Sequence, residues 1–219
     1  GGKVGLKSII GDKRFIFYFI PWIMFCFIDA FEGAILENFV IKNFGKNFIT
    51  QLLFIETSIT AFAIIITGFL IDYYGRRQIL VYGFITLGIA YALIGVASWS
   101  VFSWYVYATI NGFAIGIFVV TFVFTIWGDL SPNWMKEGYY AIGSLPYFLI
   151  VFIRKLVAPY ILTIPVSAAF SFASFFLFLA VWPLFNAPET LPEELLEARR
   201  LRSYVEKAKQ IREKYAQKS

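Results

Sequence analysis

Five charged side chains interrupt long apolar stretches of the sequence. Asp29 and Glu32 share one stretch, Glu56 lies in the next, and Arg154 and Lys155 lie in a later one. A charge inside a bilayer costs about 3 kcal/mol or more unless it is paired or hydrated. These residues could therefore bind a charged substrate or carry a proton. They could equally form a structural ion-pair network, with Lys155 extending along the apolar surface to reach water.

Other reactive residue types are scarce. The chain has no histidine, and Cys26 is its single cysteine, so an intrachain disulfide is impossible and zinc or haem ligation is disfavoured. The sequence contains no nucleophile with a neighbouring base, no cluster of metal-ligand residues and no glycine-rich phosphate-binding or dinucleotide-binding motif. We therefore expect no enzyme, no cofactor and no metal.

The composition predicts an all-α membrane protein. Hydrophobic residues make up 59% of the chain and aromatic residues 21%. Apolar stretches of about 20 residues are long enough to cross roughly 30 Å of hydrocarbon as helices, which satisfy their own backbone in lipid. The predicted spans are 15–37, 48–71, 79–97, 101–128, 139–162 and 165–187. Because the chain begins Gly-Gly instead of Met, we also expect a processed, tagged or fragmentary sequence.

Basic residues predict the orientation of these spans. Outside the spans, 15 Lys and Arg fall on one side and two, Lys42 and Lys46, on the other. The positive-inside rule makes the first side, with both termini, cytosolic. The expected domains are a cytosolic lead-in over 1–14, a transmembrane domain over 15–187 and a cytosolic tail over 188–219 in the cell membrane. The net charge of +5 reflects this asymmetry and the tail, so we expect no nucleic-acid partner.

Three of the five charges lie at one predicted depth. Asp29, Glu56 and Arg154 are 14 or 15 residues from the cytosolic ends of their spans, which is about 21–22 Å along a helix. Glu32 follows Asp29 at i+3 and shares its face. Arg154 and Lys155 point about 100° apart, so they cannot serve one acid equally.

Two cytosolic loops and the end of the last span carry the most distinctive motifs. The first runs Gly68-Phe-Leu-Ile-Asp72-Tyr-Tyr-Gly75-Arg76-Arg77. Gly68 is expected to let two helices approach closely, Gly75 to permit a tight turn, and Asp72 to face a helix N-terminus. The other two are Asp129-Leu-Ser-Pro132-Asn-Trp-Met-Lys136-Glu-Gly138 and Pro188-Glu189-Thr190.

Arg76 and Arg77 are the expected centre of a cytosolic latch. Their guanidinium groups can form forked pairs with carboxylates such as Asp129 or Glu189. A closed cluster of this kind would hold the helix ends together, and opening would have to break it. The alternative is that both arginines only anchor the topology.

These motifs resemble the loop signatures of the major facilitator superfamily, and the second and third resemble those of its sugar-porter-like members. The second departs from that pattern, with Asp for Glu, Lys for Arg and one extra residue before the glycine. The resemblance implies the C-terminal six-helix half of such a transporter. It further implies that the first and fourth helices line a cavity, the second and fifth flank it, and the third and sixth face lipid.

The resemblance implies a secondary active transporter that moves a small polar metabolite by alternating access, with or without proton coupling. Its expected partners are membrane lipid, a small-molecule substrate and a second six-helix half. We expect a C-terminal fragment or one piece of a divided chain more than a natural half-size protein. The alternative function is a non-transporting membrane subunit or scaffold that retains the fold.

The remaining features concern packing and the tail. Ala108, Gly112 and Gly116 give the fourth span a small face for close packing, and Trp22 and Asn111 are deep enough to line a cavity. Five tryptophans are expected at the membrane interfaces, namely Trp99, Trp104, Trp127, Trp134 and Trp182.

The tail carries an apolar stripe at helical spacing, which comprises Leu201, Val205, Ala208, Ile211 and Tyr215. This stripe predicts a cytosolic amphipathic helix that lies on the membrane or binds a partner. The alternative is a frayed segment.

Overall fold

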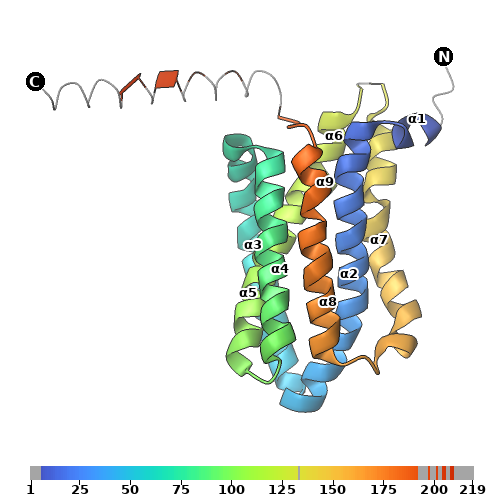
Figure 1. Ribbon diagram of the computed structural model, residues 1–219, viewed down its shortest axis with the longest axis vertical. Coiled ribbons are helices and arrows are strands. Elements are labelled where there is room, and N and C mark those ends of the chain that lie inside the picture. The colour runs from blue at the N-terminus through green and yellow to red at the C-terminus, as the bar shows by residue number, and fades with distance from the viewer. Residues whose placement is uncertain are drawn as a thin grey trace, which may run out of the picture.

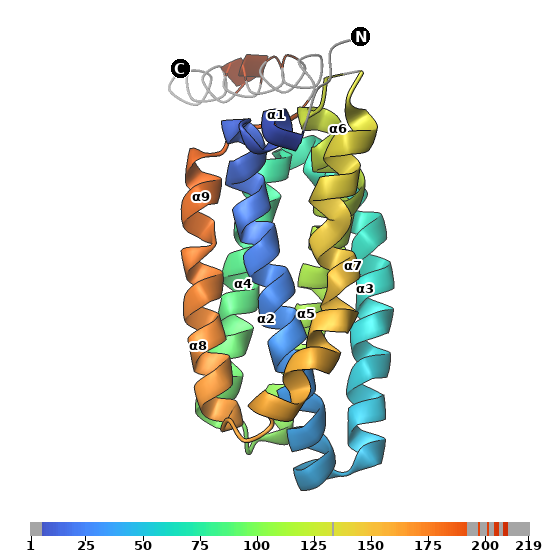
Figure 2. The same ribbon diagram turned by 90° about the vertical axis from the view of Figure 1, so that its right-hand side faces the viewer.

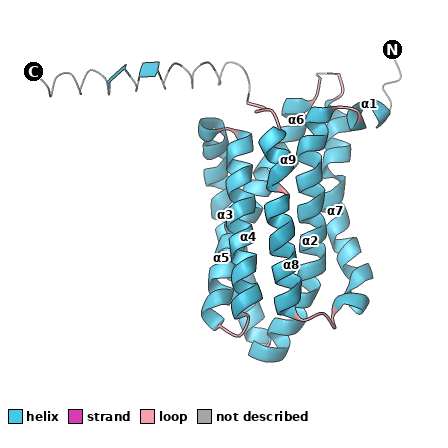
Figure 3. Ribbon diagram, viewed as in Figure 1, coloured by secondary structure: helices cyan, strands magenta, loops and turns pink. Residues whose placement is uncertain are grey.

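The computed structural model describes residues 6–132 and 134–191, together with six residues between 197 and 209. This part of the chain is helical and contains no strand, and six of its helical spans are long and apolar enough to cross a membrane (Figures 1 and 3). The predicted multi-pass helical architecture is confirmed. Most of the predicted tail helix, including Ile211 and Tyr215, lies outside the described residues.

The six spans agree with the predicted ones to within a few residues, except at the end of the first. A short helix, α1 (Leu6–Ile10), precedes α2 (Lys13–Phe44), α3 (Lys46–Tyr74) and α4 (Arg76–Ala97). The fourth span is continuous but consists of α5 (Val101–Phe118), the π-helix η1 (Val119–Thr125) and α6 (Ile126–Leu130). It is followed by α7 (Lys136–Ile161), and the last span combines α8 (Val166–Leu179) with α9 (Val181–Asn186).

Two glycines make the tightest turns between spans. Gly45 joins α2 to α3 with φ 90°, and Gly75 joins α3 to α4 with φ 95°. Side chains with a Cβ rarely adopt such positive φ angles, so each glycine lets one long helix reverse directly into the next. The turn at Gly75 lies at the end of the bundle that also carries α1, α6 and the end of α9 (Figure 1).

The bundle has three layers. Figure 2 shows α3 and α7 on one side, α2 and α5 between, and α4 and α8 on the other. In the main contacts α3 packs on α5 and α7 on α2, while α4 packs on α5 and α8 on both α4 and α2. If the first span is exchanged with the fourth, the second with the fifth and the third with the sixth, this set of contacts is unchanged. The six spans therefore consist of two three-helix repeats with matching contacts.

Helices α3 and α5 approach closely along the small face predicted for the fourth span. A Cβ added to Gly116 would lie 2.5 Å from the Ala63 Cβ, and one added to Gly112 would lie 2.7 Å from the Glu56 carbonyl oxygen. Small residues allow the two helices to come this close. The approach increases van der Waals contact, which matters in lipid because the hydrophobic effect does not drive helices together there. The predicted packing role of Gly112 and Gly116 is confirmed.

Large aromatic side chains fill the space between the layers. Trp22, Trp104 and Trp127 are fully buried. The Trp22 Nε1 donates to the Gly143 carbonyl oxygen at 2.9 Å and so joins α2 to α7. Trp104 and Trp127, expected at the membrane interfaces, have rings packed inside the bundle, whereas Trp99, Trp134 and Trp182 are exposed.

Asp12 fixes the start of α2 against α7. Its Oδ1 accepts from the Arg14 backbone N–H at 2.9 Å, and its Oδ2 accepts from the Tyr139 hydroxyl at 3.0 Å. Burial alone would raise the pKa of Asp12, but the hydrogen bonds from Arg14 and Tyr139 outweigh it and hold that pKa below its ordinary value of 3.8. The ionised carboxylate thus caps the helix and ties its first turn to a second span.

We predict that Asp12→Ala lowers the free energy of unfolding at pH 7 by about 1 kcal/mol, the usual value of a helix N-cap. A carboxyl whose folded pKa is depressed contributes its stability above the unfolded pKa and loses it as pH falls through the folded pKa. The stability gap between wild type and variant, measured by thermal unfolding, should therefore narrow as pH falls below about 3.8. A gap independent of pH would contradict the assignment.

Candidate functional site

The predicted ion pair between Arg76 and Asp129 is present at the end of the bundle that carries α1 and α6. The Arg76 Nε lies 2.9 Å from the Asp129 Oδ2, and its Nη1 lies 3.2 Å from the Asp72 Oδ1. The Arg76 side chain is 6% exposed and that of Asp129 18%, whereas that of Asp72 is 56% exposed. Asp129 is therefore the desolvated partner, and its loss would leave the buried cation with only the exposed Asp72 as counter-charge.

Glu189 completes this group from the opposite end of the chain. Its Oε1 accepts from the Arg76 backbone N–H at 2.9 Å and from the Thr190 backbone N–H at 3.0 Å. The anion at the N-terminus of α4, where the helix dipole favours it, is thus Glu189. The expectation that Asp72 holds such a position is wrong, because Asp72 pairs with the Arg76 side chain instead.

Arg77 differs from its predicted role. Its Nη1 donates to the Ala187 carbonyl oxygen at 3.1 Å, at the C-terminal end of α9. It makes no ion pair with a carboxylate within the described residues. The carbonyls at a helix C-terminus attract cations, which explains this contact. We call Asp72, Arg76, Arg77, Asp129 and Glu189 the latch cluster, since together they join the ends of four spans.

The remaining motif residues shape the loops around the latch cluster. Gly75 makes the turn as expected, with φ 95°. The Pro132 carbonyl oxygen accepts from the Met135 N–H at 2.9 Å, and the exposed Lys136 begins α7. The close approach expected at Gly68 is absent, since a Cβ there would meet no atom of the described chain within 4 Å.

Two contacts of this region, those of Tyr18 and Thr190, were not predicted from the sequence. The Tyr18 hydroxyl, on α2, donates to the Pro188 carbonyl oxygen at 2.5 Å. The Thr190 Oγ1 lies 3.4 Å from the Asp129 Oδ2. Together they attach the Pro188-Glu189-Thr190 motif to the first and fourth spans. A tyrosine in an apolar run carries no pattern that would reveal its partner 170 residues away.

Asp29, Glu56 and Arg154 meet in a cleft of about 370 Å³ between α2, α3, α5 and α7. The Arg154 Nη2 lies 3.1 Å from the Asp29 Oδ2 and donates also to the Asp29 carbonyl oxygen at 3.2 Å. These three side chains were predicted to lie at one depth in the bundle, and all three line this cleft. The buried Trp22 ring forms part of the same wall, as expected of its depth.

Glu56 is the unpaired acid of this cleft. It is half-buried on α3 and forms no ion pair with any described residue. Asp29, by contrast, is neutralised by Arg154. The cleft therefore combines a compensated ion pair with one carboxyl that is free to exchange a proton or to bind a polar ligand.

Glu32 and Lys155 do not join this group. Glu32 is buried on the side of α2 that faces α8, and Lys155 is exposed on α7. The expectation that Glu32 shares a face with Asp29 is wrong, because the two side chains line different cavities. Three residues along a helix rotate a side chain by about 60°, which is enough to turn it from one neighbouring helix to another.

A glycine makes room for the ion pair of the cleft. A Cβ added to Gly33 would lie 2.4 Å from the Arg154 Cζ, so the guanidinium occupies the space that any other side chain would fill. Gly33 directly follows Glu32 in α2. Its role could not be read from the sequence, because the spacing does not show which helix passes beside it.

The π-helix η1 lies next to the cleft. Val119, its first residue, lines the cleft, and the Thr125 Oγ1 donates to the Val120 carbonyl oxygen at 2.7 Å. Seven residues of π-helix loosen the backbone bonding of the fourth span between the cleft and Asp129. Such segments are frequent at functional sites.

Comparisons of the chain with protein-family models, curated proteins and solved structures find no match. The assignment of a function therefore depends on the geometry of the latch cluster and the cleft.

We predict that Asp129→Ala lowers the free energy of unfolding by about 3 kcal/mol, because it leaves the buried Arg76 guanidinium without its desolvated partner. The matched variant Asp72→Ala should cost less than about 1 kcal/mol, since Asp72 is mostly exposed. Thermal or denaturant unfolding of both purified variants measures the difference. Equal losses would show that burial does not distinguish the two carboxylates.

Proposed function

We propose that this chain is a six-helix half of a secondary active transporter of the major facilitator kind, which moves a small polar metabolite across the cell membrane by alternating access. The observation that carries the proposal is the cleft in which Asp29, Glu56 and Arg154 meet. Three charges at one depth of an apolar bundle are costly unless they are paired or line a polar path. Ionisable residues so placed mark substrate and proton pathways in transporters.

The order of the helices around the cleft supports this assignment. The first and fourth spans supply its central walls, the second and fifth flank it, and the third and sixth lie in the opposite layer (Figure 2). The two three-helix repeats of the bundle agree with the internal repeats from which transporter folds are built, with their binding sites at repeat interfaces.

The layer of α3 and α7 is the proposed contact face for a second six-helix half. Phe54, Phe69 and Phe148 on these helices are 70–77% exposed, and the space beside Gly68 is open. A second half packed here would close the cleft into a cavity and give Gly68 the neighbour that the described chain lacks. That half belongs to the same polypeptide, to a partner chain or to a second copy.

In this mechanism the latch cluster closes the cytosolic end of the cavity. Arg76 holds Asp129 and Glu189, so the ends of α4, α6 and α9 move as one body while these bonds last. Opening to the cytosol breaks the Arg76–Asp129 pair, and η1 gives the fourth span a point at which to bend. Glu56 carries the coupled proton, and the Asp29–Arg154 pair binds polar groups of the substrate.

The test is uptake by the intact protein that contains this chain, reconstituted in liposomes with an inward proton gradient and supplied with radiolabelled sugars, amino acids and carboxylic acids. The Glu56→Gln variant should lose gradient-driven accumulation while substrate exchange persists, because it can no longer carry the proton. The Asp29→Asn variant should reduce uptake at least about tenfold, because it leaves Arg154 unpaired in the cleft.

Glu37→Gln is the matched control, since Glu37 is an exposed acid on α2 outside the cleft. Its uptake should equal that of wild type. Full proton coupling in Glu56→Gln would remove Glu56 from the mechanism. Absence of transport, with recovery of the chain from its membrane as a stoichiometric part of a non-transporting complex, would favour the scaffold function instead.

A further inference from the structure

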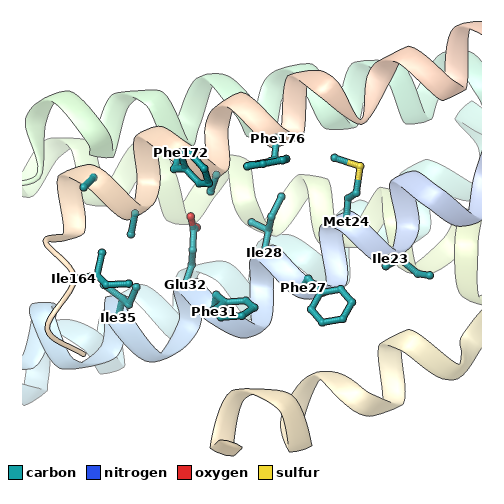
Figure 4. A pocket seen from close by; sticks show the side chains of 13 residues that line it. Ile23, Met24, Phe27, Ile28, Phe31, Glu32, Ile35, Ile164, Phe172 and Phe176 are labelled. Atoms are coloured by element: carbon teal, nitrogen blue, oxygen red, sulfur yellow. The ribbon is translucent and has the colours of Figure 1, made fainter. Parts of the chain in front are cut away.

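A second cavity lies on the other side of α2, away from the cleft. It measures about 580 Å³ and runs between α2 and α8. Its walls are aliphatic and aromatic side chains, among them Met24, Phe31 and Phe172, and Glu32 is the only one of its lining residues with an ionisable side chain. Figure 4 shows the Glu32 side chain extending from α2 toward α8, among these apolar groups.

The Glu32 carboxyl lacks a partner within the described structure. Glu32 is 3% exposed, and neither of its side-chain oxygens makes a hydrogen bond with a described residue. Tyr91 of α4 is a polar neighbour of the carboxyl, close enough to interact with it but outside hydrogen-bond geometry. A buried polar group without a hydrogen bond costs free energy that an incoming donor or cation would recover. The carboxyl is therefore a single polar anchor in an apolar slot.

The position of the anchor along the slot gives the shape of a ligand. The lining of α2 runs from Ile23 to Ile35, about 18 Å along the helix, and Glu32 lies about 4 Å from its Ile35 end. The Ile35 end also contains Ile164, from the loop between α7 and α8, whereas the Ile23 end lies toward the middle of the spans. A ligand would thus place a polar head toward the loop and an apolar body toward the middle.

The mouth of the slot is apolar and open along the seam of the two helices. Phe27 is 46% exposed, Phe31 37% and Phe172 67%. Both α2 and the span made of α8 and α9 are long and apolar enough to cross a membrane, so we place this apolar seam against the hydrocarbon of the bilayer. A molecule dissolved in the bilayer could enter from the side. Its polar head would then lie near the membrane interface and its apolar tail toward the bilayer centre, which is the orientation of amphiphiles in a bilayer.

We propose that this slot binds a lipophilic amine: a molecule with an apolar body and one cationic nitrogen that pairs with the Glu32 carboxylate. The pair removes the cost of a buried unpaired acid and forms a charge-assisted hydrogen bond in a low-dielectric site. Anionic heads such as fatty acids or phosphates are repelled, because the lining offers them no cation. This inference does not depend on transport, since the slot and the cleft lie on different sides of α2.

The test uses the full chain in nanodiscs of zwitterionic phosphatidylcholine, photolabelled with a diazirine-bearing alkylamine and mapped by mass spectrometry. Labelling should fall on α2 and α8 peptides, with dodecylamine competing and dodecanoic acid not. The Glu32→Gln variant, which keeps the shape of the slot, should weaken competition by dodecylamine at least about tenfold. If dodecanol competed as well as dodecylamine in wild type, the positive charge of the ligand would not contribute to binding, and the amine assignment would be overturned.

Two further variants keep the test decisive if Glu32→Gln fails to fold. Glu37→Gln removes an exposed acid on the same helix outside the slot and should leave labelling unchanged. Ala169→Phe fills the slot while retaining Glu32 and should abolish amine-sensitive labelling of α8. Equal labelling and equal competition in wild type, Glu32→Gln and Ala169→Phe would overturn the proposal and leave Glu32 as a buried acid without a ligand.

Discussion

Charge that cannot reach water is the constraint on which the rest of this molecule depends. Each ionisable group within the spans must find a counter-charge, a polar cavity or the surface, and the helices are arranged so that most do. Arg154 reaches Asp29 across α2 and α7, and the space for its guanidinium exists because residue 33 is glycine. Lys155, the next residue, reaches the surface instead. Glu56 and Glu32 are left without counter-charges in the described structure, and each faces a cavity.

The same constraint operates at the end of the bundle that carries α1 and α6. Arg76 is buried at the tight turn between α3 and α4, where Gly75 permits the positive φ. Its guanidinium pairs with Asp129 and its backbone N–H with Glu189, two acids from distant parts of the chain, so the turn joins the ends of the third, fourth and sixth spans. In the proposed mechanism this link is also a conformational control, because the spans separate there only if the pair breaks.

The six helices, their order and the meeting of three charges within the spans were predicted from the sequence, because these follow from the length of apolar runs and the rise per residue of a helix. The sequence also predicted the small face of α5, since Gly112 and Gly116 lie four residues apart. It could not predict contacts that depend on helix rotation. The separation of Glu32 from Asp29, the burial of Trp104 and Trp127, and the exchange of roles between Asp72 and Glu189 are all of this type. The open space beside Gly68 is different, because its expected neighbour is not among the described residues.

The most direct test of the central claim is the accessibility of the cleft from each side of the membrane. The intact protein would carry Cys26→Ser and Ile115→Cys, which leaves in this chain one thiol on the cleft wall, and would be treated with a membrane-impermeant thiol reagent in vesicles of either orientation. Adding Asp129→Ala should speed labelling of this thiol from the side of the latch cluster and slow it from the other side. In a control protein that carries Lys42→Cys in place of Ile115→Cys, the thiol lies beyond the far end of the cleft, and Asp129→Ala should not change its labelling rate. Labelling rates that do not respond to the loss of the Arg76–Asp129 pair from either side would contradict the account.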